Sequence, residues 1–128
     1  MHMLLDTHAY LWFIAGDEQL SPKAKAAIED PENLKIISAA SLWEITIKLS
    51  LGKLALKTTL ERILSDHISN NGFNLLPIET GHLIELSRLP MHHRDPFDRL
   101  LVSQCKADGL ALCSADQAFK NYDIELIW

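Results

Sequence analysis

The protein has 128 residues, of which 48% are hydrophobic and 23% are charged, and its formal net charge is −5. This size and composition are typical of a soluble globular protein, and we expect a single domain over residues 1–128. The acidic balance argues weakly against a nucleic-acid partner, because phosphates favour basic surfaces. No apolar run approaches the roughly 20 residues that a membrane-spanning helix needs, which argues against a membrane protein.

The N-terminal segment and the cysteines indicate the compartment. The first residues lack the basic region and the small-residue cleavage site of a secretory signal. Cys105 and Cys113 lie in apolar surroundings and form no CxxC pair, so we expect them to be buried small hydrophobes in a reducing compartment. We therefore expect a cytoplasmic protein.

In the first half of the chain, apolar runs and helix-capping residues predict five elements. Residues 1–5 form a short apolar run that is typical of a buried strand. Gly16 suits the left-handed end of a helix, and Ser21 followed by Pro22 is a helix start. The predicted elements are a strand at 1–5, helices at 8–15 and 22–29, a strand at 34–38 and a helix at 38–51.

The second half continues the alternation of strands and helices. Thr80 is expected to cap a short helix, and Asp95 followed by Pro96 repeats the signal of a cap and a proline. The predicted elements are a helix at 59–71, a strand at 73–78, helices at 80–89 and 96–109, and strands at 110–113 and 124–128. Short apolar strands that alternate with amphipathic helices predict a three-layer α/β/α sandwich with a mainly parallel sheet of about five strands.

Four acidic residues fall where such a sheet places its binding sites, beyond the carboxyl ends of the strands. They follow the first strand (Asp6), lie on the helix after the second strand (Glu44), lie in the first turn of the helix at Pro96 (Asp98) and follow the fourth strand (Asp116). Clustered carboxylates repel one another unless they bind protons or cations. Hard oxygen ligands favour Mg²⁺ or Mn²⁺. If four carboxylates bind metal, the rest of the chain has a net charge of −5 + 4 = −1, so the acidic balance does not exclude RNA.

Each of these acids also has a simpler structural explanation. Asp6 and Asp116 could cap the helical turns that follow them, and Glu44 could pair with Lys48 one helical turn away. Asp98 is favourable near the positive end of any helix. From the residues alone, the structural and the metal-binding interpretations both stay open.

Three segments together resemble the PIN-domain family, with the VapC-like toxins of type II toxin–antitoxin modules as the nearest subgroup. They are LLDTHAYLW (4–12), SAASLWEITIKLSLGKL (38–54) and LPMHHRDPFDRLLVSQCKADGLALCSAD (89–116). The resemblance covers nearly the whole chain and is weakest over residues 57–86. Its specificity lies in the order and spacing of the segments, since any one alone would mean little.

The resemblance implies a Mg²⁺-dependent endoribonuclease, with Mn²⁺ as an alternative ion, that is inhibited by a small antitoxin and forms a homodimer. The acidic positions of the family correspond to Asp6, Glu44, Asp98 and Asp116. We expect Asp6, Asp98 and Asp116 to hold the principal ion and Glu44 to support it or a second ion. Hydrolysis by an activated water would leave a 5′-phosphate and a 3′-hydroxyl.

Neighbouring polar residues are expected to support this site. Thr7 and Ser114 match small hydroxyl positions that could orient the carboxylates or a water. Asp95 is expected to be a helix cap, with a supporting role near the metal as the alternative. Lys48, Arg94 and Arg99 could contact RNA phosphates or could simply be solvated surface charges. Zinc binding by the adjacent histidines at 92 and 93 is disfavoured because no third ligand lies at the required spacing.

Two rival functions come from other classes. A phosphatase that uses Asp6 as its phosphoryl acceptor would usually have a second acid two residues later, where this sequence has His8. A catalytically silent PIN-like module that binds RNA or protein would not need all four acids. No glycine-rich phosphate-binding loop is present, which argues against a nucleotide-binding protein.

Overall fold

The computed structural model describes residues 1–128, and its sheet has five parallel strands in the order β3-β2-β1-β4-β5. The strands are β1 (His2–Leu5), β2 (Leu34–Ser38), β3 (Asn74–Leu76), β4 (Ala111–Cys113) and β5 (Leu126–Ile127). The strand order places β1 at the centre of the sheet, with β2 and β4 as its neighbours. The predicted α/β class and the number of strands are confirmed.

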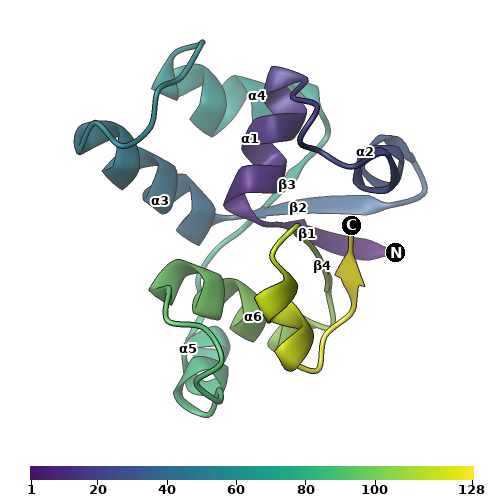
Figure 1. Ribbon diagram of the computed structural model, residues 1–128, viewed down its shortest axis with the longest axis vertical. Helices are drawn as coiled ribbons and strands as arrows, with labels where there is room; N and C mark the ends of the chain where they lie inside the picture. The colour runs from purple at the N-terminus through teal and green to yellow at the C-terminus, as the bar shows by residue number, and fades with distance from the viewer.

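Helices cover both faces of the sheet (Figure 1). The helical elements are α1 (Thr7–Ala15), α2 (Pro22–Glu29), α3 (Ala39–Ser50), η1 (Arg62–Asp66), α4 (His67–Asn70), α5 (Thr80–Ser87), α6 (Pro96–Asp108) and η2 (Gln117–Asn121). In the view of Figure 1, α1, α2 and α4 lie above the sheet and α3 lies to its left, whereas α5, α6 and the segment between β4 and β5 lie below it. This arrangement is the predicted three-layer sandwich.

The strands supply two hydrophobic cores, because successive side chains of a strand point to opposite faces. Met3 and Leu5 of β1 belong to the core beneath α1 and α2, together with Tyr10 and Ile28. Leu4, between them in sequence, belongs to the core formed with α6 and η2. Since both faces of β1 are buried, its run of apolar residues is explained.

Several predicted helix ends are confirmed. Ser21 accepts a hydrogen bond from the amide of Ala24 at 3.1 Å and caps α2. Gly16 ends α1 with φ of 64°, in the left-handed region that favours glycine. Cys105 and Cys113 are buried free cysteines, as predicted.

Two local predictions are corrected. Thr80 does not cap α5, because Glu79 is the cap residue and its amide donates to Nδ1 of His82 at 3.0 Å. The helix predicted at 59–71 contains the π-helical turn η1 ahead of α4. There the buried hydroxyl of Tyr10 donates to the carbonyl of Ile63 at 2.6 Å, which gives that carbonyl a partner outside the helix.

Four of the five strands are shorter than the apolar runs that predicted them, whereas β2 covers residues 34–38 as predicted. The run at 73–78 contributes three paired residues to β3, and the run at 124–128 contributes two to β5. None of the helices is both long and apolar enough to cross a bilayer.

Candidate active site

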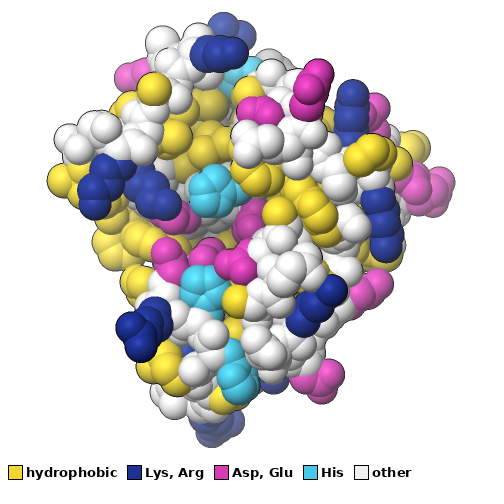
Figure 2. Space-filling model, viewed as in Figure 1, with side chains coloured by type: hydrophobic (Ala, Val, Ile, Leu, Met, Phe, Trp, Pro, Cys, Tyr) yellow, Lys and Arg dark blue, Asp and Glu magenta, His cyan; other side chains and the backbone are white.

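Acidic side chains from four separate segments lie at one edge of the sheet. Asp6 directly follows β1 and Asp116 lies three residues beyond β4, and these strands are parallel neighbours. Glu44 lies on α3 and Asp98 in the first turn of α6. In Figure 2, acidic side chains gather near the middle of the visible face, between the upper and lower groups of helices, with histidines on either side.

Asp6 and Glu44 form the buried part of this cluster, with only 6% and 3% of their surface exposed. Asp6 caps α1 by accepting from the amide of Ala9 at 2.8 Å. Burial raises the pKa of Asp6, the hydrogen bonds from Ser114 and Ala9 oppose that rise, and the charge of Glu44 adds to it. The structural and the metal-binding interpretations of Asp6 are therefore compatible, since a cap needs only one of the two carboxylate oxygens.

Glu44 is held by protein donors on both of its oxygens. The hydroxyl of Thr7 donates to Oε1 at 2.5 Å, and the ammonium of Lys48 lies 2.7 Å from Oε2. The hydrogen bond to Glu44 raises the pKa of Lys48. Thr7 thus fixes one oxygen of Glu44, and Lys48 neutralises its buried charge.

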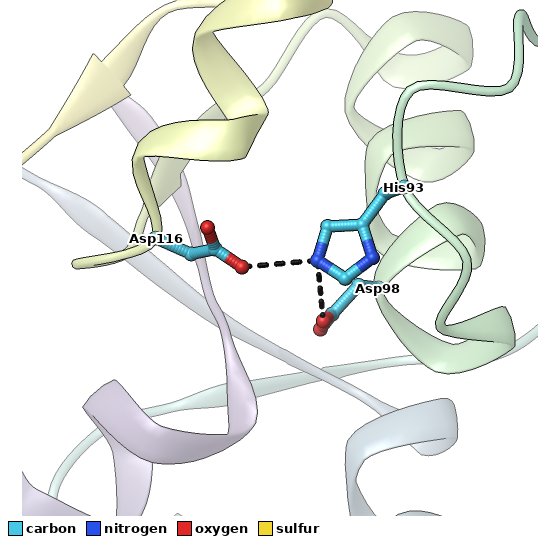
Figure 3. A group of neighbouring side chains, drawn as sticks. All are labelled: His93, Asp98 and Asp116. Carbon is cyan, nitrogen blue, oxygen red and sulfur yellow. Dashed lines mark hydrogen bonds and ion pairs between the residues drawn. The ribbon is translucent and has the colours of Figure 1, made fainter.

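Asp98 and Asp116 form the more accessible part of the cluster, and His93 lies between them (Figure 3). Burial and then the charge of Asp95 raise the pKa of Asp98 to about 7; His93 opposes the rise, and the charges of Asp6 and Glu44 add to it. Asp98 therefore experiences the field of both buried acids. The two parts of the cluster form one electrostatic unit.

Asp116 differs from the other acids because its pKa is lowered. Partial burial acts against this shift, but hydrogen bonds from the amide of Ala118 and from His93, together with the charge of His8, outweigh it. Its Oδ1 caps η2 by accepting from Ala118 at 2.9 Å, while Oδ2 faces His93. Ser114 accepts from the Asp116 amide at 3.1 Å, so this hydroxyl supports both strand-end acids.

The donor set fits a hard divalent cation. Carboxylate oxygens of Asp98 and Asp116 lie within 4.8 Å of each other and of a ring nitrogen of His93, so these two acids are close enough to share one ion. Buried carboxylates with raised pKa values are stabilised by a positive charge, and oxygen-rich sites favour Mg²⁺ or Mn²⁺ over softer metals. The residues present are therefore suitable ligands for such an ion.

The remaining candidate residues have distinct surroundings. Asp95 caps α6 by accepting from the amides of Phe97 and Asp98 at 2.8 and 3.1 Å. Arg99 directs its guanidinium to the backbone carbonyls of Leu89, Pro90 and His93. Arg94 is exposed, so its charge is accessible to a ligand in solution.

His93 was not among the residues that the sequence predicted for this site. It was considered only as part of a weak zinc motif, and zinc was disfavoured. Its position two residues before a helix cap was visible in the sequence, but its contact with Asp116 joins residues 23 positions apart. His8 was also missed, and its charge lowers the pKa of both Asp6 and Asp116.

The largest cavity, of about 860 Å³, lies beside the acids rather than over them. Side chains of α1, the segment 54–58 and η1 line it, and half of its lining residues are hydrophobic. His8 lies at its wall, whereas none of the four acids does. The acids therefore form an open rim and not an enclosed pocket.

A family model described as the PIN domain matches residues 3–125. This chain belongs to the PIN domain family. Curated proteins include no match to it. The match spans β1 through η2, so all four acids of the rim lie within the PIN domain.

Solved structures of toxin–antitoxin systems share the fold. VapBC2 from Rickettsia felis, bound to a DNA fragment from its promoter, has 16% identity and a TM-score of 0.72 over 98% of this chain and 97% of that chain. VapBC-1 from nontypeable Haemophilus influenzae has 13% identity and a TM-score of 0.68 over 98% and 96%. VapBC-5 from Mycobacterium tuberculosis has 17% identity and a TM-score of 0.64 over 98% and 97%. At such low identities, these similarities establish the fold alone.

Proposed function

We propose that this PIN-domain protein is a Mg²⁺-dependent endoribonuclease, the toxin of a toxin–antitoxin pair. The observation that carries the proposal is geometric: acids from four separate segments meet beyond the carboxyl ends of the neighbouring strands β1 and β4, next to α3 and the first turn of α6. Burial, which raises the pKa of Asp98 to about 7, agrees with this crowding. Acids from distant segments share one site in which Asp6 and Glu44 are buried, and such a site favours the binding of a divalent cation. The similarity to toxin–antitoxin structures supports the biological role.

In the proposed site, Asp6, Asp98 and Asp116 hold the ion and Glu44 supports it. When bound, Mg²⁺ would activate water and neutralise the charge that develops on the scissile phosphate. Thr7 and Lys48 fix both oxygens of Glu44, so this carboxylate is oriented before any ligand arrives. The site is therefore partly preorganised, which favours catalysis because little rearrangement is then needed.

We assign the RNA contacts to cations beside the rim. Lys48 is half-buried against Glu44, and Arg94 is exposed next to His93. The guanidinium of Arg99 already donates to three carbonyls, so its main role is to hold the segment that precedes α6. Phosphate contacts by Lys48 and Arg94 would offset the acidity of the chain near the site.

The decisive experiment incubates the purified protein with total RNA in Mg²⁺ and in EDTA and sequences the product ends. We expect cleavage in Mg²⁺ alone, with 5′-phosphate and 3′-hydroxyl ends. Asp98→Asn should abolish cleavage, whereas Asp95→Asn should retain it, because asparagine also caps helices. Full Mg²⁺-dependent cleavage by Asp98→Asn would disprove the assignment, and RNA binding without cleavage would favour a silent binding module.

The partners follow from the same proposal. We propose that a small antitoxin inhibits the enzyme in the cytoplasm, which co-expression with the product of an adjacent small reading frame would test. We also propose a homodimer, supported by the exposed apolar side chains of Leu75, Leu83 and Ile84 on β3 and α5. Sedimentation of the purified protein as a monomer at micromolar concentration would contradict the dimer.

A further inference from the structure

The segment between α5 and α6 is fastened to its surroundings, although it contains no regular structure. Arg99 donates to the carbonyls of Pro90, Leu89 and His93 at 3.0, 3.4 and 3.5 Å. The amide of His92 lies 3.2 Å from the hydroxyl of Tyr122, and the two rings pack edge to face. The segment is thus anchored to α6 and to the residue that follows η2.

These anchors hold the ring of His93 in a defined orientation. The ring stacks on Phe119, with centroids 5.5 Å apart and planes inclined by 25°. Its Nδ1 accepts from the amide of Asp95 at 3.1 Å. Its Nε2 lies 2.9 Å from Oδ2 of Asp116 and 3.2 Å from Oδ2 of Asp98 (Figure 3).

The hydrogen bond at Nδ1 determines what Nε2 can do. A neutral imidazole has one N–H and one lone pair. Because the lone pair of Nδ1 accepts from the amide of Asp95, the proton lies on Nε2. In this tautomer Nε2 is a donor to the two carboxylates and has no free lone pair to bind a metal ion.

We propose that His93 is a positioning residue, whose Nε2–H joins Asp98 of α6 to Asp116 beyond β4 and orients both carboxylates for the cation. This role rests on the proposed function, because it treats these acids as ligands. Two adjacent carboxylates repel each other, and a fixed donor between them reduces that repulsion. Since Nε2 contacts one oxygen of each acid, the other oxygen of Asp98 can still face the ion.

The first test measures Mn²⁺ affinity by calorimetry, without RNA. His93→Phe keeps an aromatic ring against Phe119 but removes the donor, and we expect roughly 10- to 100-fold weaker binding, as for other residues that orient metal ligands. His93→Gln places an amide N–H near the position of Nε2 and should restore most of the affinity. His92→Phe, the matched control on the neighbouring ring, should bind as the unmodified protein does.

Each contrary result overturns the positioning role. Unchanged or tighter Mn²⁺ binding by a folded His93→Phe would show that the histidine does not assist the ligands. Equal losses in His93→Phe and His93→Gln would show that a donor at this place is not what matters. Thermal unfolding of each variant verifies that the affinities refer to folded protein.

The second test reads the tautomer directly. Long-range ¹H–¹⁵N spectra of the histidine rings should show His93 with its proton on Nε2, both without metal and with saturating Mg²⁺. Movement of the proton to Nδ1 on addition of Mg²⁺ would identify His93 as a ligand and overturn the proposal. Neither test involves RNA cleavage, so failure of the proposed function would appear separately as metal binding without nuclease activity.

Discussion

Two histidines make the same pattern of hydrogen bonds at opposite ends of α6. His93 lies before its first turn, accepts from the amide of Asp95 at Nδ1 and faces Asp98 and Asp116 through Nε2. His82 packs near its last turn, accepts from the amide of Glu79 at Nδ1 and faces Asp108 through Nε2 at 2.9 Å. One local geometry therefore occurs in two surroundings.

The two histidines differ in how many acids they contact and in whether those acids interact with further charged residues. His82 is buried and contacts one carboxylate, that of Asp108 at the end of α6, and its hydrogen bond to Glu79 caps the start of α5. His93 meets two carboxylates, one of which also interacts with the buried acids of the rim. The pattern itself is therefore structural, and at His93 alone does it meet acids that we propose as metal ligands.

Neutralising the carboxylate that faces each histidine should reveal the largest difference between the two sites. Asp116→Asn keeps an acceptor for the amide of Ala118 and for His93 but removes a proposed metal ligand, and we expect cleavage to fall by about 10³-fold or more. Asp108→Asn should leave cleavage unchanged. Single-turnover rates at saturating Mg²⁺ measure both, and equal rates for the two variants would contradict the distinction.

The pH dependence of stability sharpens the assignment at the acidic end. The pKa of Asp98 rises to about 7 because of burial and then Asp95, so over the range from its usual value near 4 up to 7 the folded state binds a proton that the unfolded state releases. In EDTA the free energy of unfolding should therefore decrease as pH rises through this window, by at most about 4 kcal/mol.

The Asp98→Asn variant isolates this contribution from that of Asp6, whose pKa is also raised. Urea unfolding at pH 5 and pH 8 should show a smaller decrease for Asp98→Asn than for the unmodified protein. Saturating Mg²⁺ should reduce the decrease in the unmodified protein, because the cation compensates the ionised carboxylate. Equal pH dependence of the two proteins in EDTA would contradict the elevated pKa of Asp98.

The sequence predicted the features that depend on local signals. Buried strands, and caps such as Ser21 and Asp95, are encoded within a few residues, and they were placed correctly. The cap of α5 was misplaced at Thr80 because the amide of Glu79 is satisfied by His82, which Asp108 orients from 26 residues away. Strand lengths were overestimated because pairing with neighbours, and not the apolar run itself, determines where a strand ends.

In the candidate site, too, some features could be predicted from the sequence and others depend on tertiary contacts. The four acids were predicted to lie together because parallel strands bring their carboxyl ends to one edge, and because the residues resemble a known family. The orientation of His93 was not predictable, because it depends on Arg99, on Tyr122 and on stacking against Phe119. The orientation of a loop histidine depends on tertiary packing, which a short sequence motif does not encode.

Near the last turn of α6, the substitution His82→Leu removes the hydrogen bonds to Glu79 and Asp108 and the 3.4 Å contact with Gln104, while a side chain still fills the buried space. The amide of Glu79 then loses its partner, and we expect a loss of about 1–3 kcal/mol in the free energy of unfolding. Mn²⁺ affinity should be unchanged, since His82 contacts none of the rim acids. A weakened affinity in a folded His82→Leu variant would show that the two ends of α6 are coupled.

The smallest expected effect is that of Asp108→Asn on stability. Asparagine keeps an acceptor for Nε2 of His82 but removes the charge that strengthens this bond. Asp108 is also the last residue of α6, where a negative charge is unfavourable by roughly 0.3–1 kcal/mol. The two contributions oppose each other, so urea unfolding should show a change within about 0.5 kcal/mol. A loss of several kcal/mol would contradict this balance and would show that the charge of Asp108, and not only an acceptor at its position, holds His82 in place.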